Sequence, residues 1–210
     1  QLDPSSACCE VVHLLFDFFC MKIVQVNKFY YPKGGADIYM LKLSALLESA
    51  GHTVIPFAMH HRENKATPFE DFFVSTVDLR KREGFFKDLK KAARVVYSFE
   101  ARRKFKALLE QERPEVIHIH NIYHQISPSI LGVARKMKIP VVMTVHDYKL
   151  VNPNYRMFHR GELCLHSAHG NYWEAVRNRC MDTLGGSVTV AIEAYFQRWR
   201  KMYKKGVERF

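Results

Sequence analysis

The sequence predicts an α/β fold built on a doubly wound, mostly parallel sheet. Short runs rich in β-branched residues alternate along the chain with stretches of helical periodicity, which is the pattern of strands joined by helical crossovers. The chain has 210 residues, of which 48% are hydrophobic and 25% charged, so it can bury one sizeable core. This composition excludes a disordered or collagen-like chain.

The first βαβ unit is predicted over residues 21–57. Residues 21–27 form a β-branched strand, and a turn at residues 32–35 contains Gly34 and Gly35. Gly51 ends the helix that follows, and residues 53–57 form the second strand. The apolar positions expected on one face of the helix are Ile38, Leu41, Ala45 and Leu46.

The middle of the chain departs from this rhythm and then returns to it. Residues 69–113 predict a long, basic, amphipathic helical region. Its apolar positions at helical spacing are Phe85, Phe86, Leu89, Ala93, Val96 and Tyr97. Two further strands are predicted at residues 116–120 and 140–145, with a helix at residues 127–138 between them.

A long polar and aromatic segment follows the last predicted strand. Residues 146–170 are rich in histidine, residues 155–164 suggest a small hairpin, and loops of such length after a strand are usually functional. Residues 187–203 then form an amphipathic helix. Its apolar positions are Val188, Ile192, Tyr195, Phe196 and Trp199.

Positive charge is concentrated in two patches. The chain carries a net charge of +11, and most of the excess lies in residues 80–113 and 198–210. The first patch is either a solvated face over a core of aromatic residues or a surface that lies on an anionic membrane. A third interpretation is a surface that binds nucleic acid, but no nucleic-acid-binding motif supports it.

The cysteines and the apolar segments argue against a disulfide scaffold and against a membrane-spanning protein. The five cysteines have no regular spacing, which argues against a disulfide scaffold and favours a reducing compartment. No apolar window is long enough to span a membrane. We expect residues 1–20 to be an upstream extension outside the fold, and the end of the chain looks cut rather than finished.

Three polar clusters fall at predicted strand ends, where open parallel sheets bind ligands. The first spans residues 27–37, where the glycine turn offers backbone amides and a helix N-terminus to an anion, although an ordinary turn explains it equally well. The second contains His118, His120, Asn121, Tyr123 and His124, and its histidines suit polar ligand contact better than metal binding. The third is His146, Asp147 and Tyr148, where a histidine can contact a substrate hydroxyl or simply cap the strand.

A fourth cluster has metal-ligand residue types without a standard spacing. It comprises Cys164, His166, His169 and Cys180. A structural zinc site is the less favoured interpretation, and two thiols packing a loop against a helix is the more favoured one.

Four segments in this order resemble the N-terminal domain of family 4 glycosyltransferases. They are MKIVQVNKFYYPKGGAD at residues 21–37, LLESAGHTV at residues 46–54, PEVIHIHN at residues 114–121 and TVHDYKLVNPN at residues 144–154. The resemblance covers residues 21–210. It implies a GT-B architecture, in which two Rossmann-like domains face each other, and identifies this chain as the acceptor half without its C-terminal donor domain.

The resemblance implies a retaining transfer of sugar from a nucleotide-diphosphate sugar to a glycan or lipid-linked acceptor. The chain alone is then expected to be inactive. It implies no metal and no covalently bound cofactor. Many relatives build bacterial surface polysaccharides, so we expect a cytoplasmic protein that can lie on the inner face of the cell membrane.

Residue by residue, the resemblance assigns the catalytic role to His146. The residues expected to bind substrate are Gly34, Gly35, His120, Asn121, Asp147 and Tyr148. The residues expected to face an anionic membrane are Lys87, Lys90, Lys91 and Arg94. The rival interpretation is a non-catalytic Rossmann-like module that binds a membrane surface or another anion.

Overall fold

A four-stranded parallel sheet forms the centre of the molecule, which confirms the predicted fold class. The computed structural model describes residues 20–78, 81 and 83–210. The sheet contains β1 (Lys22–Val26), β2 (Thr53–Phe57), β3 (Val116–Ile119) and β4 (Val141–Met143) in the order β2-β1-β3-β4. All three strand pairs are parallel. The expected extension at residues 1–20 lies almost wholly outside the described residues.

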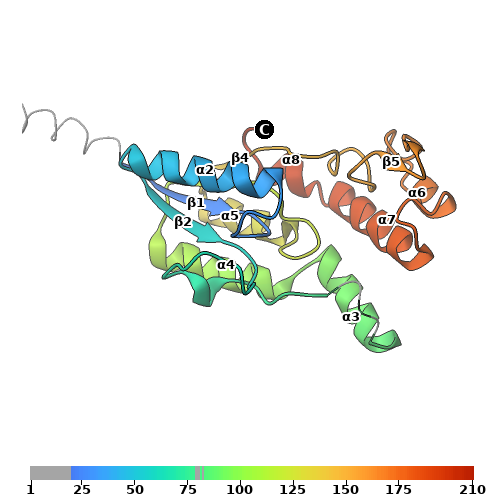
Figure 1. The fold of residues 1–210 in the computed structure, drawn as a ribbon, viewed down its shortest axis with the longest axis horizontal. Coiled ribbons are helices and arrows are strands. Elements are labelled where there is room, and N and C mark those ends of the chain that lie inside the picture. The colour runs from blue at the N-terminus through green and yellow to red at the C-terminus, as the bar shows by residue number, and fades with distance from the viewer. Residues whose placement is uncertain (1–19, 79–80, 82) are drawn as a thin grey trace, which may run out of the picture.

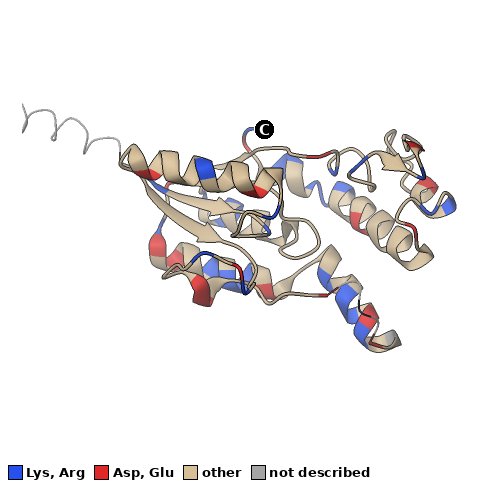
Figure 2. Cartoon of the chain, viewed as in Figure 1, with Lys and Arg blue, Asp and Glu red and all other residues tan. Residues whose placement is uncertain are grey.

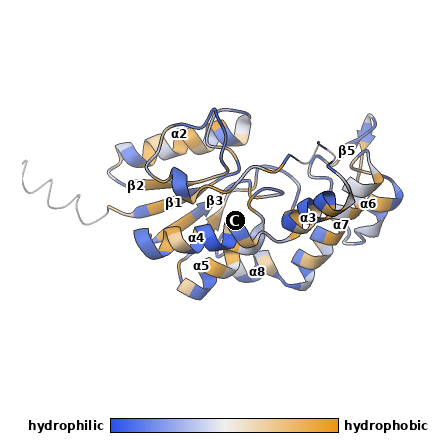
Figure 3. Ribbon diagram, turned by 90° about the horizontal axis from the view of Figure 1, so that it is seen from below, coloured by the Kyte–Doolittle hydropathy of each residue, from blue (hydrophilic) through white to orange (hydrophobic). Residues whose placement is uncertain are grey.

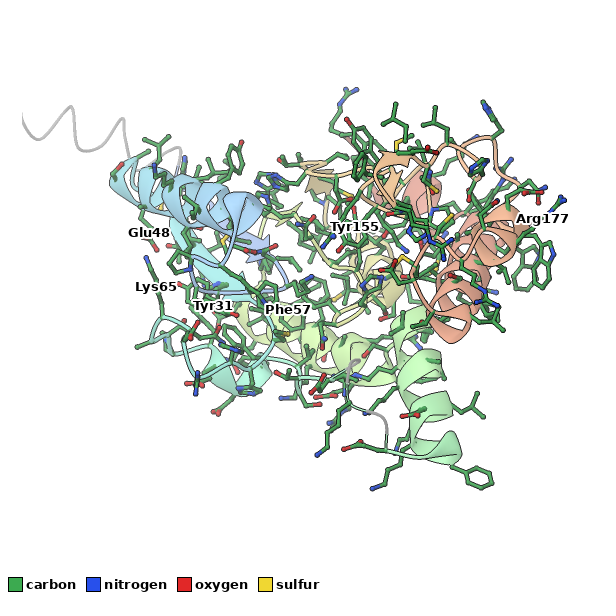
Figure 4. The ribbon with its side chains drawn as sticks, turned by 45° about the vertical axis from the view of Figure 1, so that its right-hand side comes forward. Tyr31, Glu48, Phe57, Lys65, Tyr155 and Arg177 are labelled. Carbon is green, nitrogen blue, oxygen red and sulfur yellow. The ribbon has the colours of Figure 1, made fainter. Side chains whose placement is uncertain are left out.

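Helices cover both faces of the sheet. Helix α2 (Gly35–Ser49) lies over one face, while α4 (Phe99–Glu112) and α5 (Leu131–Met137) lie over the other (Figures 1 and 3). The short 3-10 turn η3 (Pro128–Ile130) leads into α5, and another, η2 (Glu70–Phe72), lies between β2 and α4. Phe57, labelled in Figure 4, packs edge-on against Phe105 of α4 with 4.9 Å between ring centroids.

The core lies mainly between the sheet and these helices. Of the two central strands, β1 is buried on both faces from Ile23 to Val26, as is typical of parallel sheets, whereas in β3 Ile117 and Ile119 are buried and Val116 and His118 are partly exposed. At the outer edge of β4, Val142 pairs in parallel with Arg209, and the N–H of Met143 donates to the carbonyl of Arg209 at 2.9 Å. The last residues therefore lie beside the sheet.

The segment after β4 forms a second lobe. It contains the antiparallel pair β5 (Phe158–His159) and β6 (Glu162–Leu163), then α6 (Trp173–Arg177) and α7 (Leu184–Trp199), after which α8 (Met202–Gly206) returns to pack against α5. The lobe lies at one end of the sheet, where α3 (Phe85–Val96) also packs against α7 (Figure 1). The predicted hairpin is thus present, with strands of two residues each.

The predicted helical region at residues 69–113 is not continuous. It divides into η2, α3 and α4, with an extended residue, Tyr97, between the two α-helices. The division has a local cause: the side chain of Ser98 caps α4 by accepting from the N–H of Ala101 at 3.1 Å. Ser127 and Ser129 also hydrogen bond to the backbone of Ser98.

The predicted apolar faces of two helices were correct only in part. In α2, Leu46 is 64% exposed, and the buried residues are Asp37, Met40, Leu41 and Ser44. The carboxylate of Asp37 accepts a hydrogen bond from Asn27 at 2.7 Å, so the buried face of the helix includes a polar contact with the end of β1. The predicted helix at residues 187–203 is divided at Lys201 into α7 and α8, and its Trp199 is 74% exposed.

Candidate active site

The carboxyl ends of β1, β3 and β4 meet at one edge of the sheet. The chain crosses from β1 to β2 on one side, and β3 and β4 lie on the other, so this edge contains a topological switch point. Ligands of open α/β sheets bind beyond the strand ends at such a point. The structure brings the three predicted polar clusters together here.

A chain of hydrogen bonds joins His146 to the interior of the sheet. His146 Nε2 lies 2.9 Å from His120 Nδ1, and His120 Nε2 lies 2.8 Å from Gln25 Oε1. The chain continues from Gln25 Nε2 to His118 Nδ1 at 3.4 Å and from His118 Nε2 to Thr144 Oγ1 at 2.8 Å. His120 is fully buried, whereas His146 is partly exposed, so His146 is the histidine that can meet a ligand.

Burial keeps these histidines neutral near pH 7. Burial, with a smaller contribution from the neighbouring His118 and His146, lowers the pKa of His120 to about 3. Burial also lowers the pKa of His146, although the nearby carboxylates of Asp147 and Asp37 act in the opposite direction. A neutral imidazole at the sheet edge can exchange hydrogen bonds with hydroxyl groups without a large desolvation cost.

The glycine turn lies beside His146 across the ring of Tyr39, whose centroid is 5.3 Å from that of His146. Gly34 is the N-cap of α2 in an extended conformation, so neither backbone strain nor a left-handed turn explains the glycine. Crowding does not explain either glycine, because a Cβ atom added at Gly35 would meet nothing within 4 Å and one added at Gly34 would meet Asp37 Oδ2 at an ordinary 3.5 Å. The N-terminus of a helix of 15 residues is therefore open to an anionic group.

The other predicted binding residues surround this edge in different ways. The N–H of Asn121 donates to Asn27 Oδ1 at 3.2 Å, and Asn121 Oδ1 is buried without a partner among the described residues. Asp147 accepts from the N–H of Lys149 at 2.9 Å, and burial raises the pKa of its carboxyl. Tyr148 is 58% exposed and is free to contact a ligand by its ring.

Several residues of this edge were missed by sequence reasoning. Lys28 is the second residue after β1 and lies in the predicted cluster at residues 27–37 without having been singled out; burial lowers the pKa of its ammonium group, while Asp37 and Asp147 act to raise it. Gln25 is 1% exposed in the middle of β1 and carries the hydrogen-bond chain. A glutamine inside an otherwise apolar strand is the signal that could have indicated this role.

A buried ion pair joins the loop directly after β4 to helix α7. Lys149 Nζ lies 2.6 Å from Glu193 Oε2 of α7, and both side chains are almost completely buried. Gln197 Nε2 also donates to Glu193 Oε1 at 3.0 Å. Tyr155, labelled in Figure 4, contacts His124, whose Nε2 lies 3.8 Å from the same carboxylate. These contacts anchor the loop that carries His146 and Asp147 to helix α7.

The candidate metal ligands of the second lobe do not converge. Cys164 and Cys180 are buried with their Sγ atoms 2.9 Å apart, whereas His166 and His169 are exposed. Within the described part of the chain, no three His, Cys, Asp or Glu side chains gather as metal ligands. The contact between two thiols is the packing arrangement that the sequence favoured.

The four predicted membrane-facing cations lie on α3, away from the sheet edge (Figure 2). Lys87 and Lys90 are exposed. Lys91 is ion-paired with Glu83 at 3.0 Å, and Arg94 with Glu100 at 3.0 Å. Among the described helices, none is both long and apolar enough to cross a membrane.

Comparison with known proteins covers most of this edge, from the glycine turn onward. The sequence matches the family model described as Glycosyltransferase Family 4 over residues 33–192, from the glycine turn into α7. It is also 29% identical over 167 residues to an uncharacterized 42.6 kDa protein in the cps region of Klebsiella pneumoniae. That alignment covers 73% of this chain and 44% of the relative, so the chain spans less than half the length of this curated relative.

Proposed function

Because the chain belongs to glycosyltransferase family 4, we propose that it is the N-terminal, acceptor-binding part of a retaining glycosyltransferase. The enzyme takes a sugar from a nucleotide-diphosphate sugar and transfers it to a glycan or lipid-linked acceptor. The position of the relative in a cps region is consistent with synthesis of a surface polysaccharide. A second domain, which supplies most of the nucleotide site, belongs to this proposal.

The observation that carries the proposal is the placement of His146. It lies at the carboxyl end of β4, is held by His120 at 2.9 Å, and leaves one ring nitrogen for a ligand. The open N-terminus of α2 beside it suits the negative charge of a diphosphate. A sugar between the two would receive one contact from the imidazole while its leaving group meets the helix N-terminus.

The proposal is tested by the substitution His146→Ala in a full-length protein that includes this domain. We expect sugar transfer to fall by roughly 100-fold or more, because a positioned proton donor or acceptor contributes about that factor. The substitution His166→Ala is the control, since His166 is exposed and far from the strand ends. Normal transfer by the His146→Ala enzyme would remove this histidine from the reaction.

A second function, docking on an anionic membrane surface, is favoured by one observation on α3. Phe86 is 83% exposed and Leu89 58% exposed, and both lie next to the exposed cations Lys87 and Lys90. The side chain of Phe85 is outside those that the structure describes. An amphipathic helix with this composition can lie in the interface of anionic lipids, with about 1 kcal/mol contributed by each cation.

Docking is measured by sedimentation with vesicles that contain phosphatidylglycerol. The double substitution Lys87→Gln/Lys90→Gln should weaken binding by roughly 30-fold at low salt, from the loss of two cations. The control is Lys136→Gln/Lys138→Gln, which removes two exposed cations from the α5 region. Equal binding by the two double variants would show that α3 is not the docking surface. Docking and sugar transfer are compatible in one protein.

A further inference from the structure

The positions of the ring protons in the hydrogen-bond chain that ends at His146 follow from the donors and acceptors of its members. The side chain of Gln25 offers one acceptor atom, Oε1, and one donor group, the Nε2 amide with its two N–H bonds. Oε1 faces His120 Nε2 at 2.8 Å, so this nitrogen of His120 carries a proton. A neutral imidazole has one N–H only, and His120 Nδ1 is therefore an acceptor.

The same count fixes the proton of His146. Since His120 Nδ1 accepts, His146 Nε2, which lies 2.9 Å away, must donate. On the other side, the Gln25 amide donates to His118 Nδ1, and His118 Nε2–H can then donate to the Thr144 hydroxyl at 2.8 Å. Each of the four contacts has one donor and one acceptor, so the chain is complete without a mismatch.

The other nitrogen of His146 is left for the ligand. Among the described residues, no group hydrogen bonds to His146 Nδ1, and this atom is not one of the buried unpaired polar atoms. A neutral His146 with its proton on Nε2 presents a lone pair at Nδ1. Protonation of Nδ1 would leave the bond from Nε2–H to His120 in place, so His146 can gain and lose a proton there without disturbing the chain.

We propose that Gln25 and His120 are positioning residues that hold His146 in its Nε2–H tautomer, so that Nδ1 accepts a hydrogen bond from a hydroxyl of the bound sugar. The choice of a sugar hydroxyl rests on the proposed function, while the tautomer rests on the orientation of the Gln25 amide, whose Oε1 faces His120. The opposite arrangement requires the amide of Gln25 to be rotated by half a turn. It would place a proton on His146 Nδ1 and make this histidine a donor in its neutral form.

The tautomer is measured by 15N NMR of the histidine rings in this chain, with His146 assigned from the missing signals of His146→Gln. Protonated and unprotonated ring nitrogens have separate shifts. We expect Nε2 to remain protonated throughout a pH titration and Nδ1 to titrate. A neutral His146 with its proton on Nδ1 would overturn the proposal, and this result needs no variant of Gln25.

The positioning role is tested by Gln25→Met, which has a similar volume and offers His120 no acceptor. We expect the shifts of the two His146 nitrogens to move toward each other, because both tautomers become accessible. The control is Gln197→Met, a buried glutamine outside the chain of histidines that hydrogen bonds to Glu193. Unchanged His146 shifts in Gln25→Met would overturn the role of Gln25.

The consequence for the reaction is measured in a full-length protein. Gln25→Met should lower kcat by roughly tenfold or more, as substitutions of residues that orient a functional histidine commonly do, with little change in KM for the donor. In the His146→Ala background the same substitution should have no further effect, because the two act as a unit. An equal loss in both backgrounds would show a merely structural role. If the wild-type protein transfers no sugar, the proposed function fails, and the NMR result alone decides the tautomer.

Discussion

The buried pair of Lys149 and Glu193 leads to a prediction about stability. The substitution Lys149→Met removes the ammonium group but keeps most of the side-chain volume. Glu193 is 0% exposed and would lose a partner at 2.6 Å. The remaining partner is the amide of Gln197 at 3.0 Å. Breaking a buried pair by removing one partner costs about 3–5 kcal/mol, and we expect a loss in this range at pH 7.

The neighbouring histidine does not replace the lost cation. His124 Nε2 lies 3.8 Å from Glu193 Oε2, and burial lowers the pKa of His124 to about 4, so its ring is neutral at pH 7. The predicted loss is a large part of the roughly 5–15 kcal/mol by which domains are stable. Many molecules of the Lys149→Met chain should therefore unfold at urea concentrations that leave the wild type folded.

The assay is urea unfolding of the chain at pH 7, followed by tryptophan fluorescence. The control is Lys106→Met, which removes the same group from an exposed ion pair with Glu110 and should change the free energy of unfolding by less than about 1 kcal/mol. The double substitution Lys149→Met/Glu193→Gln leaves no unpaired charge and should recover part of the loss. A loss below about 1 kcal/mol in Lys149→Met would refute the conclusion that this pair is buried and isolated from water.

Two further predictions concern protons and thiols. The pKa values of His120 and His124 lie at about 3 and about 4, below the ordinary value of about 6.5. The unfolded chain therefore takes up protons first as the pH falls, and stability should decline by roughly 3–4 kcal/mol between pH 7 and pH 5, whereas equal urea midpoints at the two pH values would contradict this. Cys164 and Cys180, with Sγ atoms 2.9 Å apart, should form a disulfide when diamide accepts their two electrons and two protons, and peptide mapping should find this bond. The reaction should be slow at neutral pH, because burial raises the pKa of the Cys180 thiol to about 12, and a mapped product without this bond would contradict the geometry.

Local pattern was sufficient to predict the strands and the edge at which a site forms. The runs at residues 21–27 and 53–57 predicted β1 and β2 to within one residue at each end, because β-branched residues bounded by polar ones are typical of buried strands. Since all four strands are parallel, His120 and His146 had to arrive at the same edge of the sheet. Neither conclusion needed a distant contact.

Helix rotation and helix division could not be predicted in this way. The face of α2 that meets the sheet includes Asp37, which is buried against Asn27, a residue just beyond the end of β1. In α7 the buried face includes Glu193, which hydrophobic periodicity assigns to solvent. A charged residue is buried only where a partner is supplied from elsewhere in the fold, and the pattern of one helix does not contain that partner.

The sequence by itself thus determined the parallel α/β class, the strand ends that carry polar residues and the family to which the chain belongs. Only the tertiary structure decided which of these residues touch. Gln25 and His120 are separated by 95 positions in sequence and by 2.8 Å in space, and Lys149 and Glu193 by 44 positions and 2.6 Å. Periodicity reports how a segment divides between core and solvent, whereas a buried polar contact depends on the meeting of two segments that only the folded chain brings together.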